Sequence, residues 1–217
     1  ALRDKISPVR RKNIHVIQNG VNTKLFKPVP KIFARKKLGL PTNKKIIAYA
    51  GSLQRDQGVH ILVKAFKLLQ KRHTDIMLFL AGTLSKDKKP IDINNSGIVN
   101  KNLDQEGVNL VINAADVVVM PNQANEFTKY CFHYKLAEYM ACETPIVATR
   151  VGDVGKILEG TGHELCEPGN AEELAKKIEL SFGKGKIRGS RDKIMKNNTW
   201  DEIAKKLDLA IKQELKK

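Results

Sequence analysis

The stretch KIIAYAGSLQRDQGVHILVKAFKLLQKRHTDIMLFLAG, residues 45–82, decides the fold. It begins and ends with apolar runs rich in β-branched residues, which are typical of strands buried on both faces of a parallel sheet. Between the two runs, apolar and basic residues repeat with the period of an amphipathic helix. The apolar face of that helix consists of Ile61, Leu62, Ala65, Phe66, Leu68 and Leu69. A strand, a crossover helix and a second strand predict a right-handed βαβ unit.

Similar apolar runs recur along the chain. They predict further strands at residues 14–20, 116–121 and 145–149. Residues 83–96 are charged, contain a proline and lack helical periodicity, so we expect a surface loop there instead of a helical crossover. The predicted fold class is therefore α/β, a Rossmann-like parallel sheet flanked by helices.

Two capping-box patterns predict helix starts in the last third of the chain, Asn170 with Glu173 and Thr199 with Glu202. The second pattern opens an amphipathic helix at 199–217, which we expect to pack on or near the domain. Its apolar face consists of Trp200, Ile203, Leu207, Ile211 and Leu215.

Charge is distributed unevenly along the 217 residues, whose formal net charge is +16. Residues 1–46 hold 13 Lys and Arg against one acid, residues 47–182 hold 15 against 17, and residues 183–217 hold 11 against 5. The centre is thus near neutral. Only 6% of residues are aromatic, so no nucleic-acid partner is expected. Solvated basic ends are the favoured interpretation, and an anionic membrane surface or a missing acidic partner is the alternative.

The composition also bears on location. The longest apolar runs, such as 117–120, fall far short of the roughly 20 residues that a membrane helix needs, and no signal-like segment opens the chain. The three cysteines, Cys131, Cys142 and Cys166, form no C-x-x-C pair. Together these features predict a reducing, cytoplasmic location and give no zinc pattern. The basic, glycine-rich stretch 183–193 predicts a loop.

Two places could carry chemistry at the carboxyl ends of the predicted strands, where open α/β sheets bind ligands. The first is residues 49–60, where Gly51 ends a strand and Gly58 precedes a helix. Glycine allows close backbone approach, and a helix N-terminus offers free N–H groups to a phosphate. The spacing is not G-x-G-x-x-G, so a tight structural turn explains it equally well.

The second place is HYKLAEYMAC, residues 133–142, where Lys135 and Glu138 lie three residues apart and share a helical face. Glu138 could be a solvated carboxylate that suits the helix dipole, or it could accept hydrogen bonds from two sugar hydroxyls. Lys135 could neutralise a phosphate. Spacing leaves these alternatives open.

Four segments in order then carry a family resemblance: VIQNGVNTKLFKP, YAGSLQRDQGVHILVKAF, AADVVVMP and KLAEYMACETPIVATRVGDVGKIL. They resemble the C-terminal domain of family 4 retaining glycosyltransferases, enzymes of the GT-B fold. The resemblance covers the chain from about residue 14 to the final Trp-containing helix. It implies two facing Rossmann-like domains, of which the second binds a nucleotide-diphosphate sugar and the first binds the acceptor.

The resemblance also implies a domain plan for this chain. Residues 1–13 would be a basic interdomain linker, 14–198 the nucleotide-sugar-binding domain, and 199–217 the final helix. The acceptor-binding N-terminal domain would be a missing partner, so the isolated chain should be inactive. The implied substrate is a UDP-sugar or GDP-sugar, transferred with retention and without an obligatory metal or other cofactor.

By this resemblance Glu138 matches a glutamate that hydrogen-bonds the ribose hydroxyls. The family's partner glutamate falls eight residues earlier, where this chain has Tyr130, and Glu126 in the preceding loop is a possible substitute. The backbone at the start of the following helix would meet the diphosphate; it comprises His133, Tyr134 and Lys135.

The phosphate-binding loop departs from the family as well. Ser52 and Gln57 stand where many relatives carry an arginine and a lysine, which leaves Arg55 and Lys135 as the available cations. Val99 matches the position near which the base is held. The resemblance thus assigns catalysis to Lys135 and Glu138, and donor binding to Gly51, Ser52, Arg55, Gln57, Val99, Glu126, Tyr130, His133, Tyr134, Lys135 and Glu138.

Two other functions compete with this interpretation. One is a basic α/β module that binds nucleic acid or an anionic membrane through residues 1–46 and 183–217, and its affinity should fall steeply with salt. The other is a GT-B-type nucleotide-sugar epimerase, for which the sequence offers no supporting catalytic acids.

Overall fold

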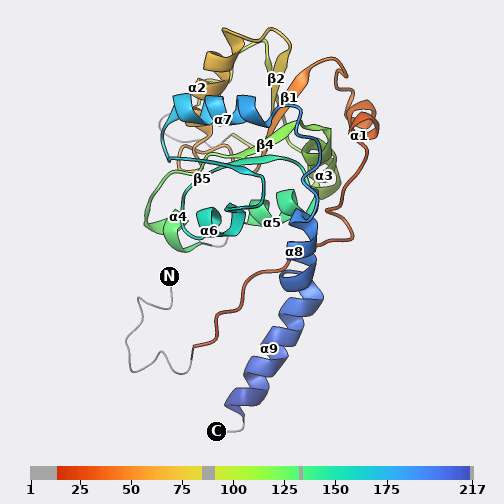
Figure 1. Ribbon diagram of the computed structural model, residues 1–217, viewed down its shortest axis with the longest axis vertical. Coiled ribbons are helices and arrows are strands. Elements are labelled where there is room, and N and C mark those ends of the chain that lie inside the picture. Colours follow the sequence, from red (N-terminus) through yellow and green to blue (C-terminus); the bar gives the residue numbers. More distant parts are fainter. Residues whose placement is uncertain (1–13, 85–90, 132–133, 216–217) are drawn as a thin grey trace.

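The computed structural model of the chain describes residues 14–84, 91–131 and 134–215 (Figure 1). Its centre is a six-stranded sheet in the order β3-β2-β1-β4-β5-β6, and every pair of neighbouring strands is parallel. The strands are β1 (Lys45–Ala50), β2 (Ile76–Ala81), β3 (Ile98–Lys101), β4 (Val117–Met120), β5 (Ile146–Thr149) and β6 (Glu164–Cys166). The predicted α/β class with a Rossmann-like parallel sheet is confirmed.

Helices cover both faces of the sheet, and each face has its own apolar core. The helices α2 and α7 pack on one face, while α3, α5 and α6 pack on the other. The helices are α1 (Lys31–Leu38), α2 (Val59–Gln70), α3 (Gln105–Ala114), α4 (Glu126–Tyr130), α5 (Tyr134–Ala141), α6 (Val154–Leu158), α7 (Ala171–Ser181), α8 (Ser190–Asn197) and α9 (Trp200–Glu214). None of the helices in the described residues is long and apolar enough to cross a membrane.

The strands predicted at 45–51, 75–82, 116–121 and 145–149 are all present. The strand predicted at 14–20 is wrong, because the structure assigns no helix or strand to these residues and only Val21 beyond them makes an isolated bridge. A β-branched run fits a pleated surface, but a strand also needs a neighbouring backbone with which to pair. Strands β3 and β6 were missed because their sequences, IVNK and ELC, include polar or charged residues and form no continuous apolar run.

The helix predicted at 59–73 is α2, and its predicted apolar face is buried except for the partly buried Leu68. Residues 91–96 of the predicted loop contain no helix or strand. The predicted loop at 183–193 needs correction, because α8 begins at Ser190, inside it.

Both predicted helix starts are present, with one half of each capping box. The side chain of Asn170 accepts a hydrogen bond from Glu173 N at 2.9 Å, and the hydroxyl of Thr199 accepts one from Glu202 N at 3.2 Å. The two glutamate carboxylates bond to other groups instead of returning to the cap backbone. One bond from the cap is therefore enough to begin each helix.

Helix α9 projects from the rest of the molecule (Figure 1). On this helix only Ile203 and Ala210 are buried. The rest of its predicted apolar face is exposed: Trp200 by 53%, Leu207 by 49%, Ile211 by 51% and Leu215 by 81%.

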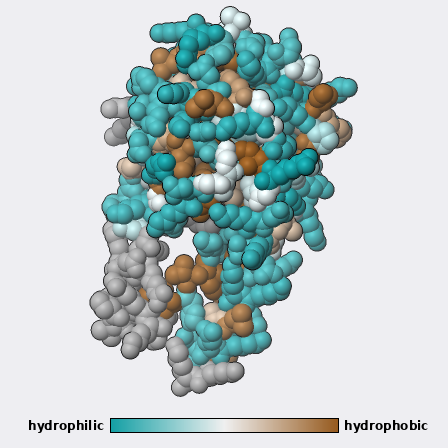
Figure 2. Space-filling model, viewed as in Figure 1, coloured by the Kyte–Doolittle hydropathy of each residue, from teal (hydrophilic) through white to brown (hydrophobic). Residues whose placement is uncertain are grey.

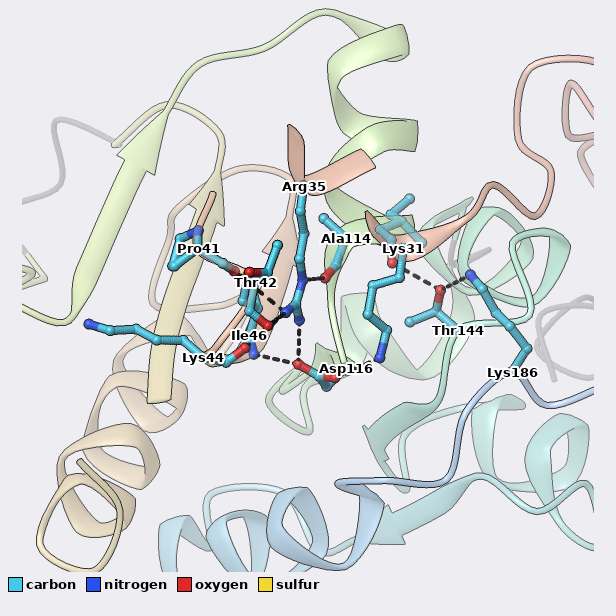
Figure 3. Close-up of polar contacts among 11 residues, drawn as sticks. Lys31, Arg35, Pro41, Thr42, Lys44, Ile46, Ala114, Asp116, Thr144 and Lys186 are labelled. Atoms are coloured by element: carbon cyan, nitrogen blue, oxygen red, sulfur yellow. Dashed lines mark hydrogen bonds and ion pairs between the residues drawn. The ribbon is translucent and has the colours of Figure 1, made fainter. Parts of the chain in front are cut away.

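Helix α1, which the sequence did not predict, is fixed to the sheet by a buried cation (Figure 3). Arg35 is only 4% exposed. Its guanidinium donates to Ala114 O at 2.9 Å and to the carbonyls of Thr42 and Lys44 at 3.0 Å. It also pairs with the Asp116 carboxylate at 2.7 Å. These residues lie where β1 and β4 begin, at the edge of the sheet that we call the amino edge.

The Asp116 carboxylate completes this cluster. It accepts from Ile46 N at 2.7 Å and from Lys31 Nζ at 2.6 Å in addition to Arg35. We call Lys31, Arg35 and Asp116 the amino-edge cluster. Its polar atoms are used within the fold, so it positions α1 and the starts of two central strands.

Candidate functional site

The two predicted sites meet at the carboxyl ends of β1 and β4. The chain moves outward from β1 to β2 and β3 on one side and from β4 to β5 and β6 on the other. The order of the strands therefore reverses between β1 and β4, and such a point leaves a crevice for ligands. Residues 51–58 follow β1 on one side of this point, and α5 lies beyond β4 on the other.

Glycine is required twice in residues 51–58. Gly51 has φ +136°, and a Cβ atom there would lie 2.9 Å from Lys135 Nζ. Gly58 has φ +75°, and a Cβ atom there would lie 1.6 Å from Pro121 O. Only a residue without a side chain allows the loop to approach both the lysine and the end of β4. The same two glycines thus allow the tight turn and its close approach to Lys135 and Pro121.

Lys135 extends from α5 across the ends of the strands. Its Nζ donates to Gln57 Oε1 at 2.7 Å and to the Tyr49 hydroxyl at 3.0 Å, and it lies 4.8 Å from the centre of the Tyr49 ring. Burial lowers the pKa of Lys135 to about 8, although the nearby charge of Glu138 opposes this shift. No carboxylate forms an ion pair with Lys135 among the described residues.

Glu138 is half-buried one turn further along α5. Burial raises the pKa of its carboxyl group, and the charge of Lys135 counteracts part of that rise. Its carboxylate makes no hydrogen bond or ion pair with another described residue. A partly desolvated acceptor without a partner is costly, so this oxygen pair is suited to a ligand that brings hydroxyl donors.

Three residues that the sequence analysis did not select hold the site together. The Tyr139 hydroxyl, fully buried, accepts from Ala50 N at 2.9 Å and so joins α5 to the end of β1. The Tyr49 hydroxyl donates to Ser52 O at 2.9 Å. Asn122, after β4, donates to Gln57 Oε1 at 3.2 Å. Tyr49 and Asn122 lie at or just beyond the ends of apolar strand runs, and that position was the available signal.

The remaining predicted residues are more dispersed. Arg55 is half-buried in the loop after β1, and Tyr134 is exposed at the start of α5. Glu126 lies exposed in the first turn of α4. His133 lies outside the described residues. Val99 lies in β3, two strands from β1, with its side chain packed against the core, so the structure does not bring it together with Lys135 and Glu138.

A cavity of about 590 Å³ lies on the opposite face of α5. Leu136, Ala137 and Met140 line it from α5, the segment 14–19 lines it from the other side, and Tyr130 also borders it. Tyr130 therefore faces this cavity, whereas Lys135 contacts Tyr49 and Gln57 at the end of β1 and Glu138 shares its side of α5. We assign the ligand site to the latter pair because the polar groups converge there. No group of three His, Cys, Asp or Glu side chains within the described residues could hold a metal ion.

Comparison with known proteins gives a consistent picture. A sequence profile described as "Glycosyl transferases group 1" matches residues 30–199. The chain is similar to D-inositol 3-phosphate glycosyltransferase of Arthrobacter sp. (strain FB24), with 32% identity over 189 residues; the match covers 82% of this chain and 44% of that protein. The chain thus spans less than half the length of this curated relative.

Two solved structures share the fold. Sucrose-phosphate synthase from Thermosynechococcus elongatus superposes with a TM-score of 0.76 at 24% identity, over 93% of this chain and 52% of that one. Anabaena Alr3699/HepE in complex with UDP and glucose superposes with a TM-score of 0.76 at 20% identity, over 91% of this chain and 56% of that one. In both comparisons this chain matches about half of a larger molecule.

Proposed function

The chain belongs to the glycosyl transferases group 1 family, and from that premise we propose that it is the nucleotide-sugar-binding domain of a retaining glycosyltransferase. The donor is a UDP-sugar or GDP-sugar, and the glycosyl group passes to an acceptor with retention at the anomeric carbon. The Anabaena protein of similar fold was solved in complex with UDP and glucose, and this supports a nucleoside-diphosphate donor. The observation that carries the proposal is the half-buried Glu138 carboxylate, which has no partner among the described residues and lies near the Lys135 ammonium on the same helix.

In this proposal each group has a distinct task. Glu138 accepts hydrogen bonds from the two ribose hydroxyls. The Lys135 ammonium and the N-terminus of α5 bind the diphosphate, and they stabilise the negative charge that develops on it when the bond to the sugar breaks. Arg55 approaches from the loop after β1. A divalent ion performs this electrostatic task in other transferases, and we propose that the cation and the helix perform it here.

The acceptor site is proposed to lie in a second domain, because this chain spans about half of its relatives. Two segments could contact such a domain, α9 and residues 14–19. Figure 2 shows hydrophobic residues on the lower part of the view, over α9 and the extended segment near residues 14–19. The exposed apolar side chains of these two segments include Val16, Trp200, Leu207, Leu209, Ile211 and Leu215. The domain alone should bind the donor without transferring the sugar.

Calorimetry with UDP, GDP, uridine and guanosine tests this function. We expect UDP or GDP to bind, and we expect Glu138→Ala to weaken the binding by about 1–3 kcal/mol because ribose hydrogen bonds to a charged group are lost. Glu159→Ala removes an exposed carboxylate elsewhere and serves as the matched control. The proposal fails if neither nucleoside diphosphate binds, or if both variants behave alike.

Peripheral attachment to an anionic membrane is a separate proposal, supported by the solvent face of α1. Ile32 is 60% exposed and Phe33 is 50% exposed, Lys36 and Lys37 lie in the last turn of the same helix, and its first turn contains no acidic residue. Apolar side chains beside lysines are typical of helices that bind an anionic lipid surface. Sedimentation with phosphatidylglycerol vesicles but not with phosphatidylcholine vesicles is expected, and Phe33→Ser should reduce it. Equal recovery with both lipids removes this proposal.

A further inference from the structure

Gln57 lies between two hydrogen-bond donors. Lys135 Nζ and Asn122 Nδ2 both donate to its Oε1, at 2.7 Å and 3.2 Å. An ammonium group has donors only, so it fixes the oxygen of the Gln57 amide toward Lys135. The amide of Asn122 is fixed in turn, because its nitrogen must face the same oxygen. The buried Oδ1 of Asn122 is left without a partner among the described residues, which is the cost of this orientation.

Tyr49 supplies the second acceptor for the lysine. Its hydroxyl donates its only hydrogen to Ser52 O at 2.9 Å, so a lone pair remains to face Lys135 Nζ at 3.0 Å. Burial raises the pKa of Tyr49 well above its ordinary value, so the phenol stays neutral. The face of the same ring lies 4.8 Å from the ammonium nitrogen and adds a cation–π contact.

Within the described part of the chain, Lys135 is therefore held by neutral groups. Two of its three N–H donors are engaged, by Gln57 and Tyr49, and one remains. A carboxylate in the place of Gln57 could make the same hydrogen bond, but it would cancel the positive charge. An alkyl side chain there would leave the charge intact, but the long lysine side chain would lose one of its two fixed partners.

We propose that Gln57 is a positioning residue, which fixes the Lys135 ammonium at the carboxyl ends of β1 and β4 without neutralising it. One N–H and the full positive charge then remain for an anionic ligand of the diphosphate class. This inference rests on the proposed function for the identity of the ligand. In this inference Gln57 acts through Lys135. The sequence analysis had instead suggested that Gln57 contacts the nucleotide sugar directly.

The first test measures binding of UDP and of inorganic pyrophosphate at about pH 7.5, below the pKa of about 8 for Lys135. Gln57→Glu keeps an oxygen acceptor for both Lys135 and Asn122 but adds a negative charge. Gln54→Glu is the matched control, since Gln54 is half-buried in the same loop and its side chain makes no hydrogen bond with other described residues. We expect Gln57→Glu to weaken both ligands by about tenfold or more and Gln54→Glu by less than about threefold. Equal losses in the two variants overturn the positioning role.

The second test needs no ligand and separates this inference from the proposed function. The side-chain carbon signal of Lys135, identified by its absence in Lys135→Arg, is titrated by NMR in each variant. In the wild-type protein the pKa of Lys135 is expected near 8, and Gln57→Glu should raise it by more than Gln54→Glu does.

The two tests fail in distinguishable ways. If the wild-type protein binds no nucleoside diphosphate, the proposed function fails while the titration still decides the role of Gln57. If Gln57→Glu leaves the Lys135 titration unchanged, the contact between the two side chains does not set the state of the lysine and the inference is wrong.

Discussion

The same two strands carry a cation at each end, and the two cations are held in opposite ways. Where β1 and β4 begin, the Arg35 guanidinium is bonded to four carbonyl groups and to the carboxylate of Asp116 (Figure 3). Where the same strands end, the Lys135 ammonium is bonded to the neutral side chains of Gln57 and Tyr49. A cation that is neutralised and saturated serves the fold, whereas one that is held but not neutralised can serve a ligand.

The energetic difference follows from desolvation. Removing one partner of a buried ion pair leaves an uncompensated charge, which is more costly than never having the pair. A cation held by neutral acceptors already bears part of its desolvation cost in the free protein, as the lowered pKa of Lys135 indicates. That cost is offset when an anion binds. The comparison predicts that mutations at the amino edge change stability and that mutations at the carboxyl edge change affinity.

The largest effect is expected for Asp116→Ala. It leaves the buried Arg35 without its counter-charge, and the free energy of unfolding should fall by about 3–5 kcal/mol. Urea denaturation followed by circular dichroism measures this change. Asp75→Ala, which breaks the more exposed pair with Lys45, is the control and should cost far less, because solvent screens that pair. Similar losses in both variants would show that the burial of Arg35 is unimportant.

The next largest effect is expected for Lys135→Met, and it should appear in binding. A charge-assisted hydrogen bond to phosphate is lost, so the affinity for UDP should fall by about 1.5–3 kcal/mol. The unfolding free energy should not fall, because the desolvation cost of the buried ammonium is removed with the charge. Arg55→Ala should cost less affinity, because a loop cation is less well fixed than one on a helix. Calorimetry on both variants decides the order, and the reverse order would assign the diphosphate contact to the loop.

The pH dependence sharpens the contrast at Lys135. Its pKa is about 8 in the folded protein against an ordinary 10.5, so between these values the unfolded chain binds more protons and stability rises with pH. The affinity for UDP should change in the opposite sense and fall as pH rises through about 8. The loss of UDP affinity with rising pH should not exceed the loss that Lys135→Met causes.

Lys186 complicates the stability measurement, because burial also lowers its pKa to about 8. The pH dependence of the Lys135→Met variant therefore serves as the baseline for both the unfolding free energy and the UDP affinity. An affinity that stays constant from well below to well above the Lys135 pKa of about 8 would contradict the role of the lysine charge.

The smallest effect is expected for Lys31→Met at the amino edge. Lys31 also bonds to Asp116, at 2.6 Å, but its side chain is 38% exposed. Pairs that water can reach contribute about 1 kcal/mol or less, so thermal unfolding should move by only a few degrees. A loss as large as that of Asp116→Ala would mean that both cations of the amino-edge cluster are structural to the same degree.

Sequence patterns predicted the features that repeat over short distances. The strands at 45–51 and 145–149 are runs of residues buried on both faces, and the spacing of Lys135 and Glu138 places them on one side of a helix regardless of the rest of the chain. The run at 14–20 carries the same signal, but among the described residues no strand pairs with it, and for that reason the prediction of a strand was wrong.

The features that the sequence could not predict depend on distant partners. Helix α1 buries an arginine on its inner face, which periodicity counts as a surface residue, and its partner Asp116 lies 81 residues away. Gln57 and Lys135 are separated by 78 residues. A pattern within one element can indicate which way a side chain points, but not which group it will meet across the sheet.

One phenol limits how α5 can move. The Tyr139 hydroxyl bonds to the backbone of Ala50, which ties α5 to the last residue of β1. Lys135 and Glu138 precede this anchor by four residues and one residue, so neither can swing independently of the sheet. Under the proposed function, a bound donor would therefore move together with the sheet as one rigid unit.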